Sequence, residues 1–399
     1  MRRFLAAIMA SFLLLTGCAQ QNDPQPVENP PEPEPPAEKI SPEEQWHQEV
    51  EAWQAQRTRQ LQALLDGMTL EEKVGQLFFV RCPEDHALED LQTYHLGGYL
   101  LFSRDFKDGD RYLTRQEVID KLQSYQDACS IPLLIGSDEE GGTVTRASRD
   151  PELFSTPIPA PQTLYNAGGM DAVLQNVVES QLTLRSLGIN VNFAPVCDVS
   201  TDPADFIYPR TLGQSADVTT EYVARTVLTM GDCGMMAVLK HFPGYGNNVD
   251  THTGVAVDQR PMETFETSDL LPFRAGIDAG APFVLVSHNI VTCMDTSLPA
   301  SLSPEVHRLL RQELGFEGLI LTDDLAMDAV KAYAKDGASA VMALQAGNDM
   351  VVTTDYRTQI PAVIAAVESG ELSENVIDDA CLRVLSYKEK WFYFPALDS

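Results

Sequence analysis

Residues 132–142, PLLIGSDEEGG, contain a short apolar run that ends at acidic residues and two glycines. A run of this kind is typical of a strand buried on both faces of a parallel sheet. Seven other runs share the pattern: Gln76–Arg81, Gly97–Phe102, Ile189–Ala194, Ala237–His241, Phe283–Ser287, Gly318–Leu321 and Asp349–Thr353. Longer amphipathic segments separate them. Eight alternating strand–helix units predict an α/β fold, a single (β/α)₈ TIM-type barrel, although the pattern alone leaves an open doubly wound sheet as the alternative.

Seven of the amphipathic segments predict helices. They are Thr114–Cys129, Met170–Leu187, Ala216–Cys233, Met262–Ala279, Ser303–Leu314, Ala326–Ala346 and a closing Ser373–Tyr387. Thr114 and Glu117 have the spacing of a capping box. Ser303 and Ser373 are the expected N-caps of their helices. The sequence shows no internal repeat beyond this alternation.

The N-terminal residues have the pattern of an export signal. Arg2 and Arg3 precede the apolar run Phe4–Leu15, which is too short to span a bilayer. The run ends at Leu15-Thr16-Gly17-Cys18, which resembles the cleavage box of bacterial lipoproteins. We expect a signal peptide over residues 1–17, a lipidated Cys18, and an extracytoplasmic protein anchored to the bacterial cell membrane. An ordinary signal peptide with a chance cysteine is the alternative.

Composition predicts the remaining organisation. Residues 18–45 are rich in proline and glutamate and predict a disordered linker, followed by a catalytic barrel over 46–399. The net charge of −30 argues against a nucleic-acid partner but is compatible with a sugar. The seven cysteines show no metal-binding spacing. We expect no metal, no cofactor and a monomer.

Polar side chains follow several of the predicted strands. In a barrel the carboxyl ends of the strands carry the active site. The residues at these positions are Asp138 and Arg146, Asp198 and Arg210, Lys240 and His241, and Asp323 and Asp324. Loops after strands are polar in any case, but charges directly at the end of an apolar run are costly to bury unless they are used. One of the paired aspartates could be a nucleophile, although the pair could also cap a helix or bind a metal.

The loop after the fifth strand contains Asp250-Thr251-His252. Residues two apart in an extended segment can lie on the same side, so the Asp250 carboxylate can reach a ring nitrogen of His252. Such a contact fixes the tautomer and raises the basicity of the other nitrogen. An isolated Asp-x-His is more often a surface hydrogen bond, and this one gains weight from its position beside Lys240 and His241.

Taken together, these motifs resemble glycoside hydrolase family 3, in particular its β-N-acetylhexosaminidases. The motifs that carry the resemblance are DEEGG at 138–142 with Arg146, NFAPVCD at 192–198, KHFPG at 240–244, DTH at 250–252, LPFR at 271–274, LGFEG at 314–318 and TDDLAM at 322–327. They occur in the family's order over about residues 65–390. Each motif is modest alone, but the set is highly specific.

The resemblance implies an exo-acting, retaining β-N-acetylhexosaminidase that removes terminal GlcNAc from cell-wall muropeptides or chitin-like fragments. Asp323 would be the nucleophile, forming a glycosyl-aspartate intermediate, and His252 with Asp250 the acid–base dyad. The carbohydrate would be bound by Asp138, Arg146, Arg210, Lys240 and His241.

Three other functions remain open. A β-glucosidase of the same family would usually take its acid–base glutamate from a following domain, and none is visible after the eighth strand. A lipoprotein that only binds sugar would not need Asp250, His252 and Asp323 together. A metal-dependent amidohydrolase would usually carry His-x-His after its first strand, where this chain has Arg81-Cys82-Pro83. Tyr245 departs from the family's common histidine, and the loop before Asp250 looks slightly shorter than usual, which leaves the aglycone preference open.

Overall fold

Eight parallel strands form one sheet that curves into a nearly closed barrel. They are β1 (Phe78–Arg81), β2 (Gly98–Leu101), β5 (Leu134–Ser137), β6 (Val191–Asn192), β7 (Met236–Phe242), β9 (Phe283–Val286), β11 (Leu319–Thr322) and β12 (Val351–Thr353). Each strand pairs with the next along the chain, and β12 pairs in parallel with β1. A single parallel bridge, Leu321 to Met350, links β11 to β12. The predicted α/β barrel is confirmed, and the open doubly wound sheet is excluded.

The structure is a computed structural model that describes residues 41–248, 256–331, 333 and 338–394. The chain divides into two compact units, Met1–Glu51 and Ala52–Ser399. The described residues of the first unit belong to the start of helix α1 (Pro42–Gly67), so residues 42–45, at the end of the predicted linker, are helical. The predicted signal peptide and Cys18 lie outside the described residues. Among the helices that can be described, none is long and apolar enough to cross a membrane.

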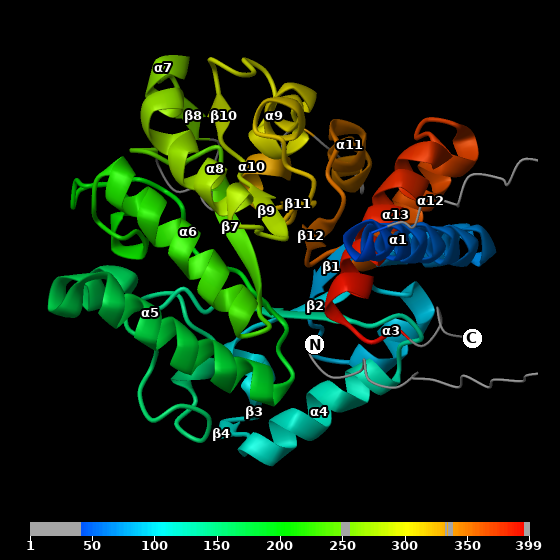
Figure 1. Cartoon of the computed structure of the whole chain (residues 1–399), viewed down its shortest axis with the longest axis horizontal. Coiled ribbons are helices and arrows are strands. Elements are labelled where there is room, and N and C mark those ends of the chain that lie inside the picture. The colour runs from blue at the N-terminus through cyan, green and yellow to red at the C-terminus, as the bar shows by residue number, and fades with distance from the viewer. Residues whose placement is uncertain (1–40, 249–255, 332, 334–337, 395–399) are drawn as a thin grey trace, which may run out of the picture. The chain divides into compact units, whose positions relative to one another are not determined.

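Helices surround the strands of the second unit (Figure 1). They are α2 (Leu70–Gln76), α3 (Ala87–Tyr94), α4 (Arg115–Asp127), α5 (Pro161–Leu187), α6 (Ala216–Asp232), α7 (Met262–Thr264), α8 (Leu270–Asp278), α9 (Pro304–Arg308), α10 (Asp328–Lys331), α11 (Ala338–Ala346), α12 (Tyr356–Ser369) and α13 (Glu374–Trp391). Thr114 and Glu117 form the predicted capping box of α4. The side chain of Ser303 caps α9, whereas Ser373 precedes α13 without a side-chain capping bond.

Three predicted helices are less regular than their sequences suggested. A π-helical turn, Phe265–Asp269, separates α7 from α8, and a second, Leu309–Glu313, follows α9. The segment expected to form one helix over 326–346 contains two separate helices, α10 and α11. Helices α1, α2, α3 and α12 were not predicted.

Aromatic rings fill the barrel where neighbouring strands carry glycine. The rings of Phe79 in β1 and Phe193 after β6 meet edge to face, with centroids 5.2 Å apart. A Cβ atom at Gly136 would lie 2.7 Å from Phe79 and 2.8 Å from Phe193, and one at Gly98 would lie 2.9 Å from Phe79. Only glycine at these two positions leaves room for the rings. The interior is therefore a packed core rather than a pore.

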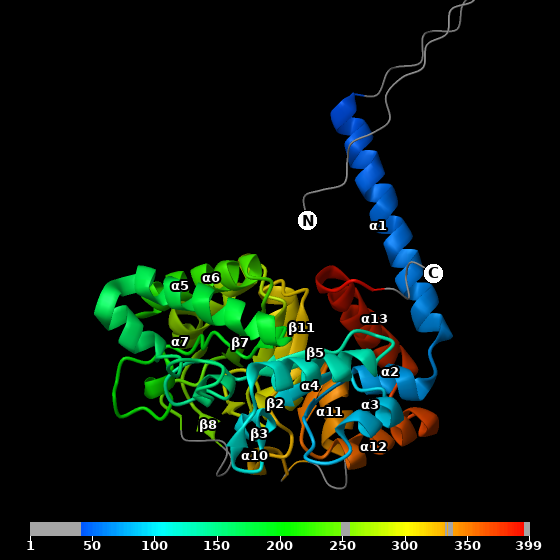
Figure 2. The same ribbon diagram turned by 90° about the horizontal axis from the view of Figure 1, so that it is seen from below.

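The loops that follow the strands form one end of the barrel. Short segments in these loops include β3 (Lys107–Asp108), β4 (Arg111–Tyr112), β8 (Val257–Asp258) and β10 (Ile290–Val291). In Figure 2, β3, β8 and α10 lie along one edge of the barrel unit. Because all eight strands run in the same direction, the side chains at their carboxyl ends meet at this end.

Candidate active site

A cavity of about 330 Å³ opens at the carboxyl ends of the strands. Six of the predicted site residues line it: Asp138, Arg146, Arg210, Lys240, His241 and Asp323. Lys240 and His241 lie in β7, and the others follow β5, β6 and β11, so the six are up to 185 residues apart in the chain. Apolar side chains complete the wall: Leu100, Phe102, Val144, Phe193, Leu285, Met327 and Val352.

Asp138 joins two of the cavity's cations. Its Oδ1 atom accepts from Lys240 Nζ at 2.8 Å, and its Oδ2 atom accepts from Arg146 Nη2 at 3.3 Å. Lys240 is almost fully buried, whereas Asp138 and Arg146 are partly exposed to the cavity. These contacts hold a carboxylate and a guanidinium in place at the cavity, as the predicted role in binding sugar hydroxyls requires.

Glu140 forms a second link beneath the cavity surface. It pairs bidentately with Arg210, at 2.9 Å to Nε and 2.7 Å to Nη2, and its Oε1 lies 2.5 Å from Lys240 Nζ. Burial alone would raise the pKa of Glu140, but the charges of Arg210 and Lys240 hold it well below its usual range. Glu140 is therefore a buried anion that fixes two of the predicted sugar-binding cations.

His241 is held between Asp198 and Arg210. Its Nδ1 lies 2.7 Å from Asp198 Oδ2, and its Nε2 lies 2.9 Å from Arg210 Nη2. An arginine nitrogen can only donate, so Nε2 accepts and the proton resides on Nδ1, which donates to Asp198. Tyr245, the departure from the family pattern, is buried, and its ring centroid lies 5.7 Å from that of His241. It packs against the histidine that was predicted to bind the sugar.

An irregularity in β7 places two successive side chains in the cavity. The pairing of β7 with β9 shifts register between Leu239 and Phe242. In a regular strand Lys240 and His241 would point to opposite faces, but both line the cavity, and the peptide bond between them is cis. This shift could not be read from the apolar pattern alone.

The loop after β5 is organised around a buried carboxylate. Glu139 Oε1 accepts from the backbone nitrogens of Arg146 and Ala147, the first at 2.8 Å. Burial raises the pKa of Glu139. Gly141 has a φ of 94°, and a Cβ there would lie 2.2 Å from the carbonyl oxygen of Pro159, so only glycine fits this turn. The loop thereby returns Arg146 to Asp138.

Asp323 and Asp324 have different surroundings. Asp323 lines the cavity, is partly exposed, and continues the ladder of β11 through a 3.0 Å bond from its backbone nitrogen to Val286. The Asp324 carboxylate accepts from the backbone nitrogen of Ala326 at 2.9 Å and from the Thr354 hydroxyl at 2.8 Å. Asp324 thus ties β11 to the segment after β12. Both aspartates line the cavity, and Asp323 stays the predicted nucleophile.

The predicted acid–base dyad, Asp250 and His252, lies outside the described residues. The described residues on either side of it contact one another. Asn248 Nδ2 donates to Asp258 Oδ2 at 2.7 Å, and Arg260 pairs with both Asp258 and Asp269. Burial raises the pKa of Asp269 to about 6, against the attraction of Arg260.

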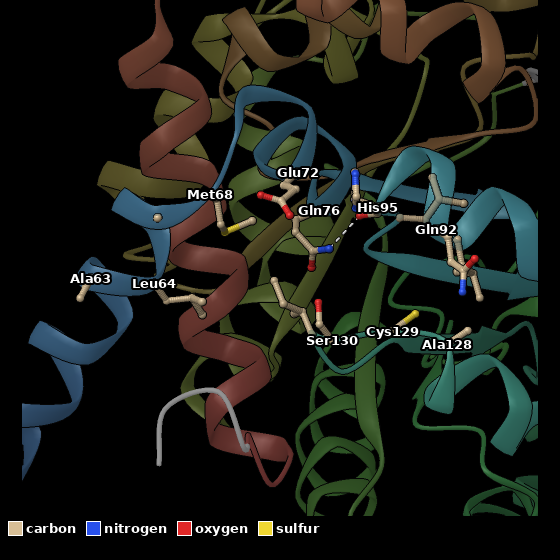
Figure 3. A pocket seen from close by; sticks show the side chains of 14 residues that line it. Ala63, Leu64, Met68, Glu72, Gln76, Gln92, His95, Ala128, Cys129 and Ser130 are labelled. Atoms are coloured by element: carbon tan, nitrogen blue, oxygen red, sulfur yellow. Dashed lines mark hydrogen bonds between the residues drawn. The ribbon is translucent and has the colours of Figure 1, made fainter. Parts of the chain in front are cut away.

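A larger cavity, of about 490 Å³, lies at the opposite end of the barrel (Figure 3). Glu72, Gln76, His95 and Ser130 lie around it, on segments that precede strands β1, β2 and β5. None of the predicted site residues lines it. In the described residues, no group of three or more histidine, cysteine, aspartate or glutamate side chains could hold a metal ion.

Sequence reasoning missed three of the residues that shape the cavity. The acidic run and the strand-end motif included Glu140 and Asp198, but neither was given a role, because their partners lie 43–100 residues away. Arg81 entered the sequence analysis only because it occupies the position where a metal-dependent amidohydrolase would carry a histidine. Its position at the end of the first strand was the signal that could have found it.

Comparisons with known proteins place this arrangement in a family. The family model of the glycosyl hydrolase family 3 N-terminal domain matches residues 69–387. The β-hexosaminidase of Nitrosomonas eutropha is 33% identical over 264 residues, which cover 64% of this chain and 73% of the relative. The β-hexosaminidase LpqI of Mycobacterium tuberculosis is 30% identical over 330 residues, covering 79% of this chain and 82% of the relative.

Solved structures agree with the sequence comparisons. A family 3 β-N-acetylglucosaminidase from a Paenibacillus species superposes with a TM-score of 0.74 at 30% identity, covering 84% of this chain and 64% of that one. A β-N-acetylhexosaminidase from Beutenbergia cavernae gives a TM-score of 0.71 at 28% identity, covering 81% of this chain and 99% of that one. The chain is therefore a glycoside hydrolase and belongs to glycoside hydrolase family 3.

Proposed function

We propose that this protein is a retaining β-N-acetylhexosaminidase that removes terminal β-linked GlcNAc from cell-wall muropeptides or chitin-like fragments. The observation that carries the proposal is the single cavity shared by Asp323 and the five predicted sugar-binding residues. The relatives described above are named as β-hexosaminidases or β-N-acetylglucosaminidases, which supports the same reaction and substrate.

The proposed reaction has two steps. The Asp323 carboxylate attacks the anomeric carbon while His252 gives a proton to the departing glycosidic oxygen, and a glycosyl-aspartate forms. Water, deprotonated by His252, then attacks the same carbon and releases Asp323. Two displacements at one carbon give net retention of configuration. His252 is protonated before the first step and neutral after it, so it never places a second negative charge beside the anionic nucleophile, and Asp250 would orient it.

The described residues would bind and orient the sugar. Asp138 offers carboxylate oxygens to hydroxyl groups, and Arg146 donates beside it. Arg210, Lys240 and His241 form the opposite side, held by Glu140 and Asp198. Because these groups are already paired with one another, the sugar meets a fixed set of donors and acceptors, which reduces the entropy lost on binding.

The test is hydrolysis of 4-nitrophenyl β-GlcNAc. The wild-type protein should release 4-nitrophenol, and Asp323→Ala should reduce the rate by several orders of magnitude. Asp120→Asn, at an exposed aspartate on α4, is the matched control and should retain activity. Binding of GlcNAc without hydrolysis by the wild type would indicate a sugar receptor. Faster hydrolysis of the β-glucoside would indicate a β-glucosidase.

We also propose that Cys18 is lipidated and holds the enzyme at the outer face of the bacterial cell membrane. The support is the apolar run that ends at Leu15-Thr16-Gly17-Cys18 and the Pro/Glu-rich residues after it. Metabolic labelling with an alkyne fatty acid should mark the wild type but not Cys18→Ser. Cys293→Ser, at an exposed cysteine of the barrel unit, should label like the wild type. Equal labelling of all three proteins would contradict the anchor.

A further inference from the structure

One cation of the cavity has no ionic partner among the described residues. Strand β1 ends at Arg81, whose side chain lines the cavity. In the part of the chain that the structure describes, Arg81 makes no ion pair or hydrogen bond, and its Nε atom is buried without a partner. Burying part of a guanidinium in this way is costly unless a ligand supplies the missing acceptor.

The other cations that line the cavity each have a carboxylate partner. Arg146 pairs with Asp138, Arg210 pairs with Glu140, and Lys240 pairs with both acids. Arg81 lines the same cavity but forms no ion pair in the described part of the chain. Its guanidinium can therefore pair with an anionic group of a ligand.

A contact with an aromatic ring holds Arg81 in position. Its guanidinium carbon lies 4.2 Å from the centre of the Phe102 ring, and that of Arg146 lies 5.1 Å from the same ring. Phe102 is fixed in turn, because its backbone nitrogen donates to Asp105 Oδ2 at 2.7 Å. The charge of Arg81 reaches Asp105, but that carboxylate is already bonded to Phe102 and lies 3.8 Å from Arg104. The guanidinium N–H donors of Arg81 therefore remain available to a ligand.

We propose that Arg81 is a specificity-determining residue that binds an oxyanion, a carboxylate or a sulfate, carried by the glycan in the cavity. A planar guanidinium matches such groups with two parallel hydrogen bonds. Arg81 and Arg146 lie against one ring, so a glycan held by Arg146 and Asp138 can reach Arg81 with a charged substituent. This inference rests on the proposed function, and it defines which hexosaminides the enzyme prefers.

Two substrate pairs distinguish where the oxyanion lies. The first is 4-methylumbelliferyl β-GlcNAc and its 6-sulfate, which carries the charge on the cleaved sugar. The second is GlcNAc-β1,4-GlcNAc and GlcNAc-β1,4-MurNAc, which carries a carboxylate on the leaving sugar. We expect one of the two pairs to respond, and that pair identifies the sugar that carries the oxyanion. In it, Arg81→Gln should lower kcat/KM for the anionic substrate roughly tenfold to hundredfold more than for the neutral substrate. Arg81→Lys, which keeps the charge but not the fork, should lose less, and Arg225→Gln, a surface control paired with Glu221, should not discriminate.

Binding measured without turnover separates this inference from the proposed function. Titration calorimetry on Asp323→Ala should show tighter binding of the same anionic ligand, and Asp323→Ala/Arg81→Gln should lose that preference. The inference is overturned if Arg81→Gln weakens both members of each pair equally, which would make Arg81 a structural residue. It is also overturned if Asp323→Ala binds neither anionic ligand more tightly than the matching neutral ligand. Failure of the proposed function would appear instead as absence of hydrolysis of the neutral substrates by the wild type.

Discussion

Replacing Glu140 with glutamine tests whether the buried ion pairs position the sugar-binding residues. The substitution keeps the size of the side chain but removes the charge between Arg210 and Lys240. At 2.5 and 2.7 Å, and with an effective dielectric constant of about 20, each contact is worth roughly 6 kcal/mol before desolvation is subtracted. Desolvation of the buried ions offsets most of that attraction, so the intact network adds little net stability.

Breaking the network destabilises the fold, because buried Arg210 loses its carboxylate partner and buried Lys240 keeps only Asp138. We expect Glu140→Gln to lower the free energy of unfolding at pH 7 by about 3–5 kcal/mol. Glu221→Gln, which breaks an exposed pair with Arg225, should cost less than about 1 kcal/mol. The kcat/KM of Glu140→Gln on the neutral substrate should also fall, because Arg210 and Lys240 lose the group that orients them.

Urea unfolding across a pH series measures both the size and the origin of the effect. The pKa of Glu140 is far lower in the folded protein than in the unfolded chain, so its contribution is complete above the unfolded value of about 4.3. That contribution should decline as the pH falls from about 5 towards the folded pKa. The reasoning is refuted if Glu140→Gln costs no more than Glu221→Gln at pH 7, or if the difference from the wild type stays constant as acid is added.

Three further predictions concern titrating groups. Burial raises the pKa of Asp269 to about 6, so its contribution to wild-type stability should fall as the pH rises from about 4 to 6. Asp269→Asn should remove that fall. The prediction is wrong if urea unfolding gives the variant the same pH profile as the wild type. Burial lowers the pKa of Lys388 to about 7, so stability should rise by up to roughly 1.4 kcal/mol per pH unit between pH 7 and 10, and Lys388→Met should abolish this slope. His252→Ala should slow substrates with poor leaving groups more than activated ones, and equal losses across a leaving-group series would exclude its acid role.

Most of the fold could be predicted from the sequence because buried parallel strands leave a strong local signal. All eight apolar runs coincide with barrel strands, including the two-residue strand β6. Helix boundaries were accurate where a cap was present, as at Thr114. The prediction failed where tertiary packing decides the outcome. No local pattern gave the π-helical turn at Phe265–Asp269 or the turn at Tyr333, which lies between α10 and α11.

The site was only partly predictable, because its contacts span long distances in the chain. Motif resemblance selected the residues that line the cavity, but it could not show which carboxylate holds which cation. The pairing of Arg210 with Glu140 joins residues 70 positions apart, on loops that follow different strands. The tautomer of His241 follows only from its neighbours in space. Arg81 belongs to no motif, and apart from its position at the end of β1 only the geometry of the cavity marks it.

The ring of Phe193 lines the cavity and packs against that of Phe79, and the two rings fill the barrel in the space left by Gly98 and Gly136. A passage through the barrel is therefore blocked, and the pocket is a dead end. A polymer could not be threaded through it, and each released sugar would have to leave by the way it entered. Such an enzyme would release its glycan after every hydrolysis, and accumulating monosaccharide would compete with the terminal sugar of the next glycan for the cavity.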